Sequence, residues 1–148
     1  MASQGDASPA RIQVMEAAVE GEIERVGLAL GAEVAAAFGP RDEAALSLMA
    51  RDGAGAPVGG LLGASHWRWL YVRQLWVAPE ARGTGVGRAL MERAEAIARA
   101  RGCAGAYLDT FSPDAARFYA AMGYAEAGRI EGFPPGHARR YFAKRFES

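Results

Sequence analysis

A strand, a glycine-rich turn and a helix follow one another directly in the middle of the chain, and this succession limits the fold more than any other feature. Residues Leu70–Val77 are almost continuously apolar, which is typical of a central strand covered on both faces. The turn Arg82–Gly87 follows, and apolar residues at helical spacing then predict a helix from about Gly85 to Arg101. The succession therefore favours an α/β domain, in which strands and helices pack around one core.

Periodic apolar residues predict the remaining elements. The other expected helices are Glu20–Phe38 and one that begins at Ser112 and ends at Gly123; the other expected strands are Arg11–Glu16, Ala44–Asp52, Val58–Trp67, Gly105–Asp109, Tyr124–Glu131 and Ala138–Phe146. A strand–helix–strand segment in the second half implies a parallel pair with a right-handed crossover, and hairpins add antiparallel pairs. We expect one α/β domain over residues 10–148, with a mixed, mostly antiparallel sheet of six to seven strands and helices on both faces. Residues 1–9 are small and polar, which predicts a disordered tail.

The composition excludes several classes of protein. The chain of 148 residues carries 17 Lys and Arg against 17 Asp and Glu, and this balance argues against a nucleic-acid-binding protein. Cys103 is the only cysteine, so neither an intrachain disulfide nor a thiolate metal cage can form. No apolar run has the length of a signal peptide or a membrane span, so we expect a cytoplasmic protein without membrane partner or bound metal.

The glycine-rich turn has the properties of a site for a phosphate-containing ligand. Gly83, Gly85 and Gly87 lack a Cβ, so backbone N–H groups can approach a ligand closely. These groups lie at the N-terminus of the predicted helix, where the dipole attracts anions, and Arg82 and Arg88 flank them. The turn has neither the Gly-Lys-Ser/Thr end of a Walker loop nor the glycine spacing of a dinucleotide site, which excludes both. A purely structural turn remains an alternative.

Two segments together resemble the GNAT superfamily of N-acetyltransferases. The first, Arg82-Gly83-Thr84-Gly85-Val86-Gly87, is similar to the acyl-CoA-binding motif of that family, R/Q-x-x-G-x-G/A. The second runs from Tyr107 to Tyr124 and resembles the family's later strand and helix, with a Tyr followed by a Gly-Tyr pair. The motifs stand in the family's order and cover residues of about 75–124.

The resemblance implies where acetyl-CoA binds. In the family the glycine-rich turn holds the pyrophosphate, which assigns to acetyl-CoA the residues Arg82, Gly83, Thr84, Gly85, Val86, Gly87 and Arg88. Two central parallel strands of the family splay apart, so the backbone of Leu75, Trp76 and Val77 would pair with the pantetheine amides. Ser112 stands where many members have an Asn that touches the pantetheine, and it either makes a hydrogen bond there or serves only as a helix N-cap.

The resemblance also implies a general acid. Tyr119 matches the tyrosine that donates a proton to the departing sulfur in the family, and a purely structural aromatic residue is the alternative. The general base is less defined, because the strand before the turn lacks the Glu that many members carry. His66, a water relayed to Asp109 or Glu80, or no base at all remain open.

These residues predict an enzyme that moves an acetyl group from acetyl-CoA to a primary amine. Direct attack in a ternary complex is favoured, because no Cys or Ser has an adjacent base that would support an acyl-enzyme. A non-catalytic acyl-CoA-binding sensor is the alternative. The acceptor, a small-molecule amine or a peptide, is left open, and a homodimer is expected only by analogy with the family.

Overall fold

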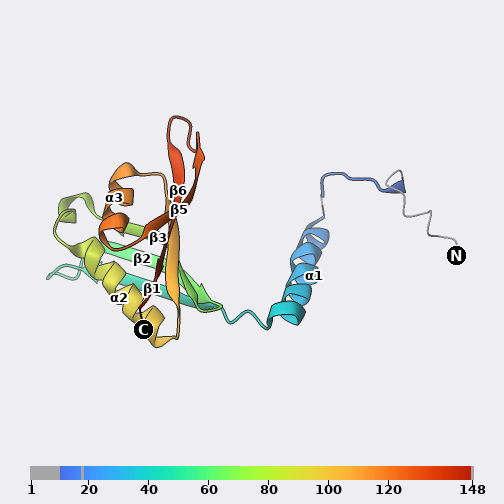
Figure 1. The fold of residues 1–148 in the computed structure, drawn as a ribbon, viewed down its shortest axis with the longest axis horizontal. Helices are drawn as coiled ribbons and strands as arrows, with labels where there is room; N and C mark the ends of the chain where they lie inside the picture. Colours follow the sequence, from blue (N-terminus) through green and yellow to red (C-terminus); the bar gives the residue numbers. More distant parts are fainter. Residues whose placement is uncertain (1–10, 18, 148) are drawn as a thin grey trace. The chain divides into compact units, whose positions relative to one another are not determined.

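The chain is seen in a computed structural model that describes residues 11–17 and 19–147. It divides into two compact units, one that ends at Pro40 and one that begins at Arg41. The first unit contains α1 (Glu20–Phe38), with the bounds that the apolar spacing predicts. The second contains a six-stranded sheet with the helices α2 (Val86–Ala100) and α3 (Pro113–Ala121) (Figure 1). The expected disordered tail, residues 1–9, lies outside the described residues, and one domain over 10–148 stays a prediction.

The segment Arg11–Glu16 was expected to be a strand, and this prediction is wrong. Residues 12–16 have no regular structure, and no strand of the described chain pairs with them. Ile12 and Val14, whose alternation suggests a strand, are exposed. Alternation is not sufficient for a strand, because the backbone N–H and C=O groups also need a neighbouring strand as their partner.

The sheet has the strand order β1-β2-β3-β4-β6-β5. Its members are β1 (Ala44–Arg51), β2 (Pro57–His66), β3 (Trp69–Val77), β4 (Gly105–Thr110), β5 (Ala125–Glu131) and β6 (Ala138–Arg145). Each lies within one residue of its predicted bounds at either end. Only β3 and β4 run parallel, and every other neighbouring pair is antiparallel, which confirms the predicted mixed α/β sheet.

The parallel pair at the centre of the sheet is splayed. β3 and β4 pair through three residues each, and the last pair is Tyr71 with Tyr107. Beyond this point β3 continues to Val77 and β4 to Thr110 without a ladder between them. The backbone edges of both strands are therefore available to a ligand that enters between them.

A β-bulge marks the place where the two strands diverge. Leu62 of β2 pairs with Gln74 of β3, whereas the next residue, Gly63, pairs with Val72, so Arg73 is an extra residue on β3. A bulge bends its strand and increases the local twist. The bulge therefore bends β3 two residues beyond Tyr71, the last residue of β3 that pairs with β4.

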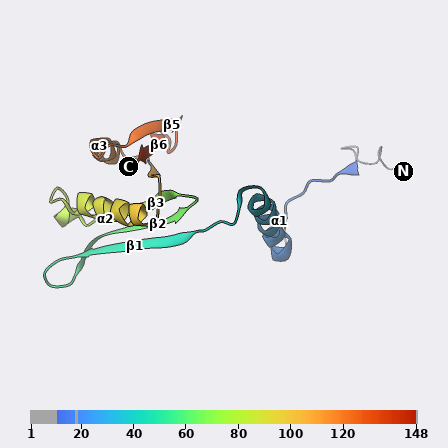
Figure 2. The same ribbon diagram turned by 60° about the horizontal axis from the view of Figure 1, so that its bottom comes forward.

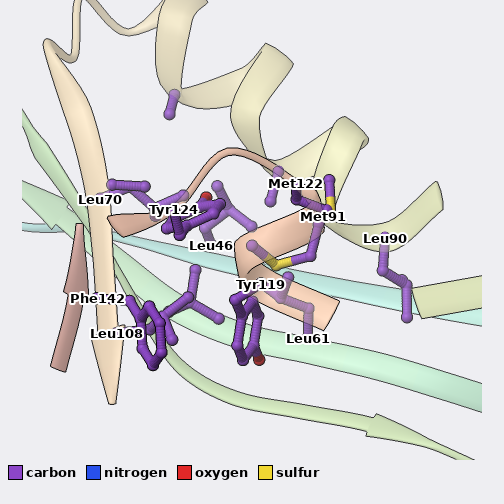
Figure 3. Packing of buried hydrophobic residues seen from close by; sticks show 14 of the residues in the cluster. Leu46, Leu61, Leu70, Leu90, Met91, Leu108, Tyr119, Met122, Tyr124 and Phe142 are labelled. Atoms are coloured by element: carbon purple, nitrogen blue, oxygen red, sulfur yellow. The ribbon is translucent and has the colours of Figure 1, made fainter. Parts of the chain in front are cut away.

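One cluster of buried side chains joins the sheet to both helices of the second unit. In Figure 3 the labelled residues, among them Leu61, Met91 and Tyr119, gather between the strands and the helices. Because residues of α2 and α3 belong to this one cluster, the two helices cover the same face, and Figure 2 shows α2 lying along β1, β2 and β3. Helices on both faces stay a prediction.

The strand β3 is central, but the expectation that both of its faces are covered along its whole length is wrong. Leu70 and Val72 are buried, whereas Arg73 and Gln74 are exposed and Trp76 is 50% exposed. The last residues of this apolar run, up to Val77, line a cleft beside the splayed strands.

A buried carboxylate ties α2 to the end of the sheet. Glu95 is 3% exposed and accepts hydrogen bonds from the hydroxyl of Tyr124 at 2.7 Å and from Nζ of Lys144 at 2.9 Å. The same Nζ donates to the carbonyl oxygen of Met122. Burial and the bond to Glu95 raise the pKa of the Tyr124 hydroxyl far above its usual value, so Tyr124 is a donor at all physiological pH values. The network holds the end of α3, α2 and β6 together.

We expect Lys144→Met to lower the free energy of unfolding by about 2–3 kcal/mol, because Glu95 would remain buried without a cation. Urea denaturation measures the change. Glu43→Gln is the control, since its pair with Arg41 is exposed and its loss should cost less than about 0.5 kcal/mol. Equal losses in the two variants would contradict a stabilising role for the buried pair.

Candidate active site

A cleft of about 1060 Å³ opens where β3 and β4 separate. Ten of the twelve residues that the sequence predicts for the site line it: Leu75, Trp76, Val77, Arg82, Gly83, Gly85, Gly87, Arg88, Ser112 and Tyr119. Thr84 and Val86 do not, because the Thr84 hydroxyl donates to the carbonyl oxygen of Ala81 and Val86 packs against the core. The cleft brings together side chains of β3, β4, α2, α3 and β6.

The glycine-rich turn presents backbone N–H groups at one end of the cleft. Gly83 and Gly85 have φ angles of +77° and +92°, a conformation that side chains disfavour. Gly85 is the N-cap of α2, and no side chain caps this helix. The first helical bond back to the turn comes from the N–H of Ala89, so the N–H groups of the first turn can bind an anion.

Two arginines add positive charge beside these N–H groups. Arg82 is oriented by a hydrogen bond from its Nε to the carbonyl oxygen of Val77 at 3.0 Å. Arg88 lies in the first turn of α2 and pairs with Glu92 on the exposed helix surface at 3.6 Å. The first turn of α2 has no acidic residue, so nothing there opposes a diphosphate.

Ser112 caps α3 as its sequence predicts. Its Oγ accepts a hydrogen bond from the N–H of Ala115 at 3.2 Å, and Pro113 follows in the first turn. The same residue lines the cleft. The cap is therefore shown by a contact, whereas a bond from Ser112 to pantetheine stays a prediction.

We expect Ser112→Ala to lower the free energy of unfolding by about 1 kcal/mol, the usual effect of a lost N-cap. The KM for acetyl-CoA should change less than about threefold, because one neutral hydrogen bond contributes little net free energy. Thermal denaturation and steady-state kinetics measure the two effects. A large increase in the KM for acetyl-CoA at unchanged stability would instead show that Ser112 acts in cofactor binding rather than as a cap. Ser112→Asp, which restores a capping oxygen, is the control for stability.

The candidate general acid lies in the wall of the cleft. Tyr119 of α3 is 6% exposed, and its ring packs edge-on against Phe118 and Tyr124 with centroid distances of 5.2 and 5.9 Å. Burial raises the pKa of Tyr119 to about 12, and the negative charge of Asp109 adds to the effect. The hydroxyl therefore carries its proton at neutral pH and can donate it.

The pH dependence of turnover follows from this pKa. A phenol that acts as an acid is active below its pKa and inactive above it, so the contribution of Tyr119 is lost only as the pH rises through about 12. We expect no descending limb from Tyr119 in the kcat profile between about pH 6 and about pH 10. A limb in this range that disappears in Tyr119→Phe would contradict the raised pKa.

Asp109 is the candidate proton acceptor that the structure places in the cleft. Its carboxylate accepts a hydrogen bond from Nη1 of Arg139 at 2.7 Å and one from the hydroxyl of Tyr71 at 3.2 Å. The side chain is 18% exposed and lies at the end of β4, where the parallel strands have separated. Asp109 can therefore face an amine in the cleft.

The other two candidate bases do not line the cleft. His66 is paired with Trp69 at the opposite end of β3 and borders a separate cavity of about 340 Å³ with Ser65 and Arg101. Glu80 belongs to the short 3-10 helix η3 (Pro79–Ala81) that precedes the glycine-rich turn. Of the three base candidates, Asp109 is thus the one that lines the cleft, where it can accept a proton through a water molecule.

Besides Asp109, ten residues that the predicted site did not include line the cleft, and among them are Arg73, Phe111, Phe118 and Arg139. Phe118 had a local signal, since it stands between Arg117 and Tyr119 on a helix that the sequence predicts. The contact of Arg139 with Asp109 had no local signal, because Arg139 reaches Asp109 from β6, 30 positions along the chain. Its guanidinium lies over the ring of Phe133 at 4.2 Å and over the ring of Phe111 at 5.2 Å.

Comparison with known proteins agrees with the geometry of the cleft. The sequence model described as the acetyltransferase (GNAT) family matches residues 14–124. The chain belongs to the GNAT family. Acetyltransferase Atu2258 of Agrobacterium fabrum is 39% identical over 111 residues, which are 75% of this chain and 81% of that protein. Family membership confirms the expected enzyme class, an acetyltransferase, and the expected α/β fold.

The names of further similar proteins mention small-molecule acceptors and coenzyme A. Blasticidin-S acetyltransferase of Streptomyces morookaense is 46% identical over 83 residues, which are 55% of this chain and 61% of that protein. A crystal structure of an acetyltransferase from Bacillus cereus matches with a TM-score of 0.82 at 29% identity, over 90% of this chain and 98% of that one. The same fold, at 16% identity and a TM-score of 0.63, occurs in an aminoglycoside 6'-N-acetyltransferase solved with coenzyme A, over 70% of this chain and 74% of that one.

The described helices of this GNAT protein give no sign of a membrane segment, because none of them is both long and apolar enough to span a bilayer.

Proposed function

We propose that the protein transfers an acetyl group from acetyl-CoA to the primary amine of a small molecule, by direct attack in a ternary complex. One observation carries the proposal: a single cleft contains both the uncapped N-terminus of α2 and the buried, protonated Tyr119. The first suits a diphosphate and the second suits a departing thiolate.

Different residues of the cleft have different proposed roles in the reaction. The N–H groups around Gly85 and Gly87, with Arg82 and Arg88, would hold the diphosphate. The edge of β3 from Leu75 to Val77, which β4 leaves unpaired, would bond to the pantetheine amides. The amine would lose a proton to Asp109, directly or through a water molecule, and attack the acetyl carbon. The hydroxyl of Tyr119 would give its proton to the sulfur as the carbon–sulfur bond breaks.

A small-molecule amine is the proposed acceptor. The relative from Streptomyces morookaense bears the name Blasticidin-S acetyltransferase and is 46% identical over the matched residues. The name belongs to that protein, and it supports the same class of acceptor, an amine-bearing antibiotic or a related metabolite, for this chain.

Thiol release from acetyl-CoA tests the proposal. The protein is incubated with acetyl-CoA and a panel of amines that includes blasticidin S, an aminoglycoside, amino acids and a short peptide. We expect thiol release above the rate without acceptor for at least one small amine, together with a product that is heavier by one acetyl group. Binding of CoA in calorimetry without release by any amine would instead indicate an acyl-CoA-binding sensor.

A further inference from the structure

The cleft lies where β3 and β4 separate, and it is lined by charged and aromatic residues besides those of the diphosphate end. Side chains alternate between the faces of a strand, so Asp109 lies on the face opposite to the buried Leu108. Five residues that line the cleft, which include Asp109, are called the outer mouth: Arg73, Trp76, Asp109, Phe111 and Arg139. Tyr119 belongs to the other face, where it packs on Phe142 in the core. A molecule at the outer mouth therefore approaches the reacting centre from the side away from the core.

Asp109 is held in a fixed orientation at the outer mouth. Arg139 donates to its Oδ2 and Tyr71 donates to its Oδ1, which leaves a lone pair on each oxygen for a further donor. Asp114 is the other acidic residue that borders the cleft, but its side chain is 90% exposed and pairs with Arg117. Asp109 is thus the carboxylate of the described cleft that can receive an ammonium group.

A second charged group stands across Tyr71 from Asp109. Arg73 is the extra residue of the bulge on β3, and its guanidinium lies 5.8 Å from the centroid of the Tyr71 ring. Arg73 is exposed and lines the cleft, and no carboxylate of the described residues forms an ion pair with it. Its planar donors are therefore free to bind an anion such as a carboxylate in two-point fashion.

We propose that the outer mouth selects acceptors that carry both an amine and an anionic group, with the ammonium at Asp109 and the anion at Arg73. This inference rests on the proposed transfer to an amine and adds the class of acceptor. The outer mouth holds two cations, Arg73 and Arg139, and one anion, Asp109, so a second positive charge on the acceptor would be repelled there. Polyamines and other polycations are accordingly poor acceptors.

Matched pairs of acceptors test the charge pairing. Glycine, β-alanine, γ-aminobutyrate and ε-aminocaproate are each compared with their primary amides, which have the same amine but no carboxylate. We expect kcat/KM for the acid to exceed that for the amide by about tenfold or more at the best chain length, as one charged hydrogen-bonded pair allows. Each comparison is a ratio, so slow transfer to a small probe is sufficient.

Two variants assign the effect to the outer mouth. In Arg73→Gln the ratio of acid to amide should fall to within about twofold of unity, while the KM for acetyl-CoA stays unchanged. In Asp109→Asn both acids and amides should lose about tenfold or more in kcat/KM, since both carry the ammonium group. Arg93→Gln is the matched control, because Arg93 is exposed on α2 and does not border the cleft.

The outcomes separate this inference from the proposed function. Acetylation of acids and amides at equal rates, or a preference that survives in Arg73→Gln, overturns the charge pairing and leaves acetyl transfer intact. Absence of thiol release with every amine, blasticidin S included, overturns both. Because Arg73 is exposed on a strand surface, Arg73→Gln is expected to fold, and its ratio decides the question even if Asp109→Asn does not fold.

Discussion

Tyr119→Phe should lower kcat by about 100- to 1,000-fold, the usual contribution of a positioned general acid, while the affinity for acetyl-CoA stays within about twofold. The physical reason is that the phenylalanine ring keeps the packing on Phe118, Tyr124 and Phe142 but has no proton to give. The thiolate would then leave without neutralisation, or with a proton from a less well placed water molecule. Single-turnover kinetics with saturating acetyl-CoA measure the chemical step directly.

Tyr141→Phe is the matched control for this loss. Tyr141 lies on β6, is 37% exposed and does not border the cleft, so removal of its hydroxyl should leave kcat within about twofold. The denaturation midpoint of both variants should stay near that of the unsubstituted protein. Equal and small effects of the two substitutions on kcat at every pH would remove Tyr119 from the mechanism and leave it a core aromatic residue.

Gly85→Val should weaken binding of acetyl-CoA by about tenfold to 100-fold, because one or two hydrogen bonds to a charged diphosphate would be lost. Gly85 has a φ of +92°, which valine avoids, and no atom lies within 4 Å of the place where its Cβ would stand. The substitution therefore strains the turn rather than the core, and it reorients the N–H groups at the start of α2. Isothermal calorimetry with CoA measures the affinity.

A glycine at the other end of α2 is a control with a similar backbone strain. Gly102 follows α2 with a φ of +85°, also with no atom within 4 Å of an added Cβ, and it does not border the cleft. Gly102→Val should therefore lose a similar free energy of unfolding, about 1–2 kcal/mol, while CoA affinity stays unchanged. If the two variants bind CoA equally well, the turn is structural and the diphosphate lies elsewhere.

The helices and the glycine-rich turn were predictable because their signals are local. The spacing of apolar residues placed α1 at its observed bounds, and the Ser112-Pro113 pair marked the start of α3. Periodicity failed at Arg11–Glu16, where the alternation exists but no partner strand does. A local pattern can indicate which conformation a segment prefers, but a strand also depends on a neighbouring strand, which is often far along the chain.

The sequence by itself determined the strand–turn–helix segment, and its resemblance to the GNAT family implied the residues proposed for a diphosphate and Tyr119 as the candidate acid. Only the tertiary structure decided which charged groups share the cleft with them. Arg139 meets Asp109 across 30 positions and Tyr71 meets it across 38, whereas His66 lies at the opposite end of β3. These distances depend on strand pairing and on the bulge at Arg73, which are properties of the whole sheet, so no local pattern in the sequence could report them.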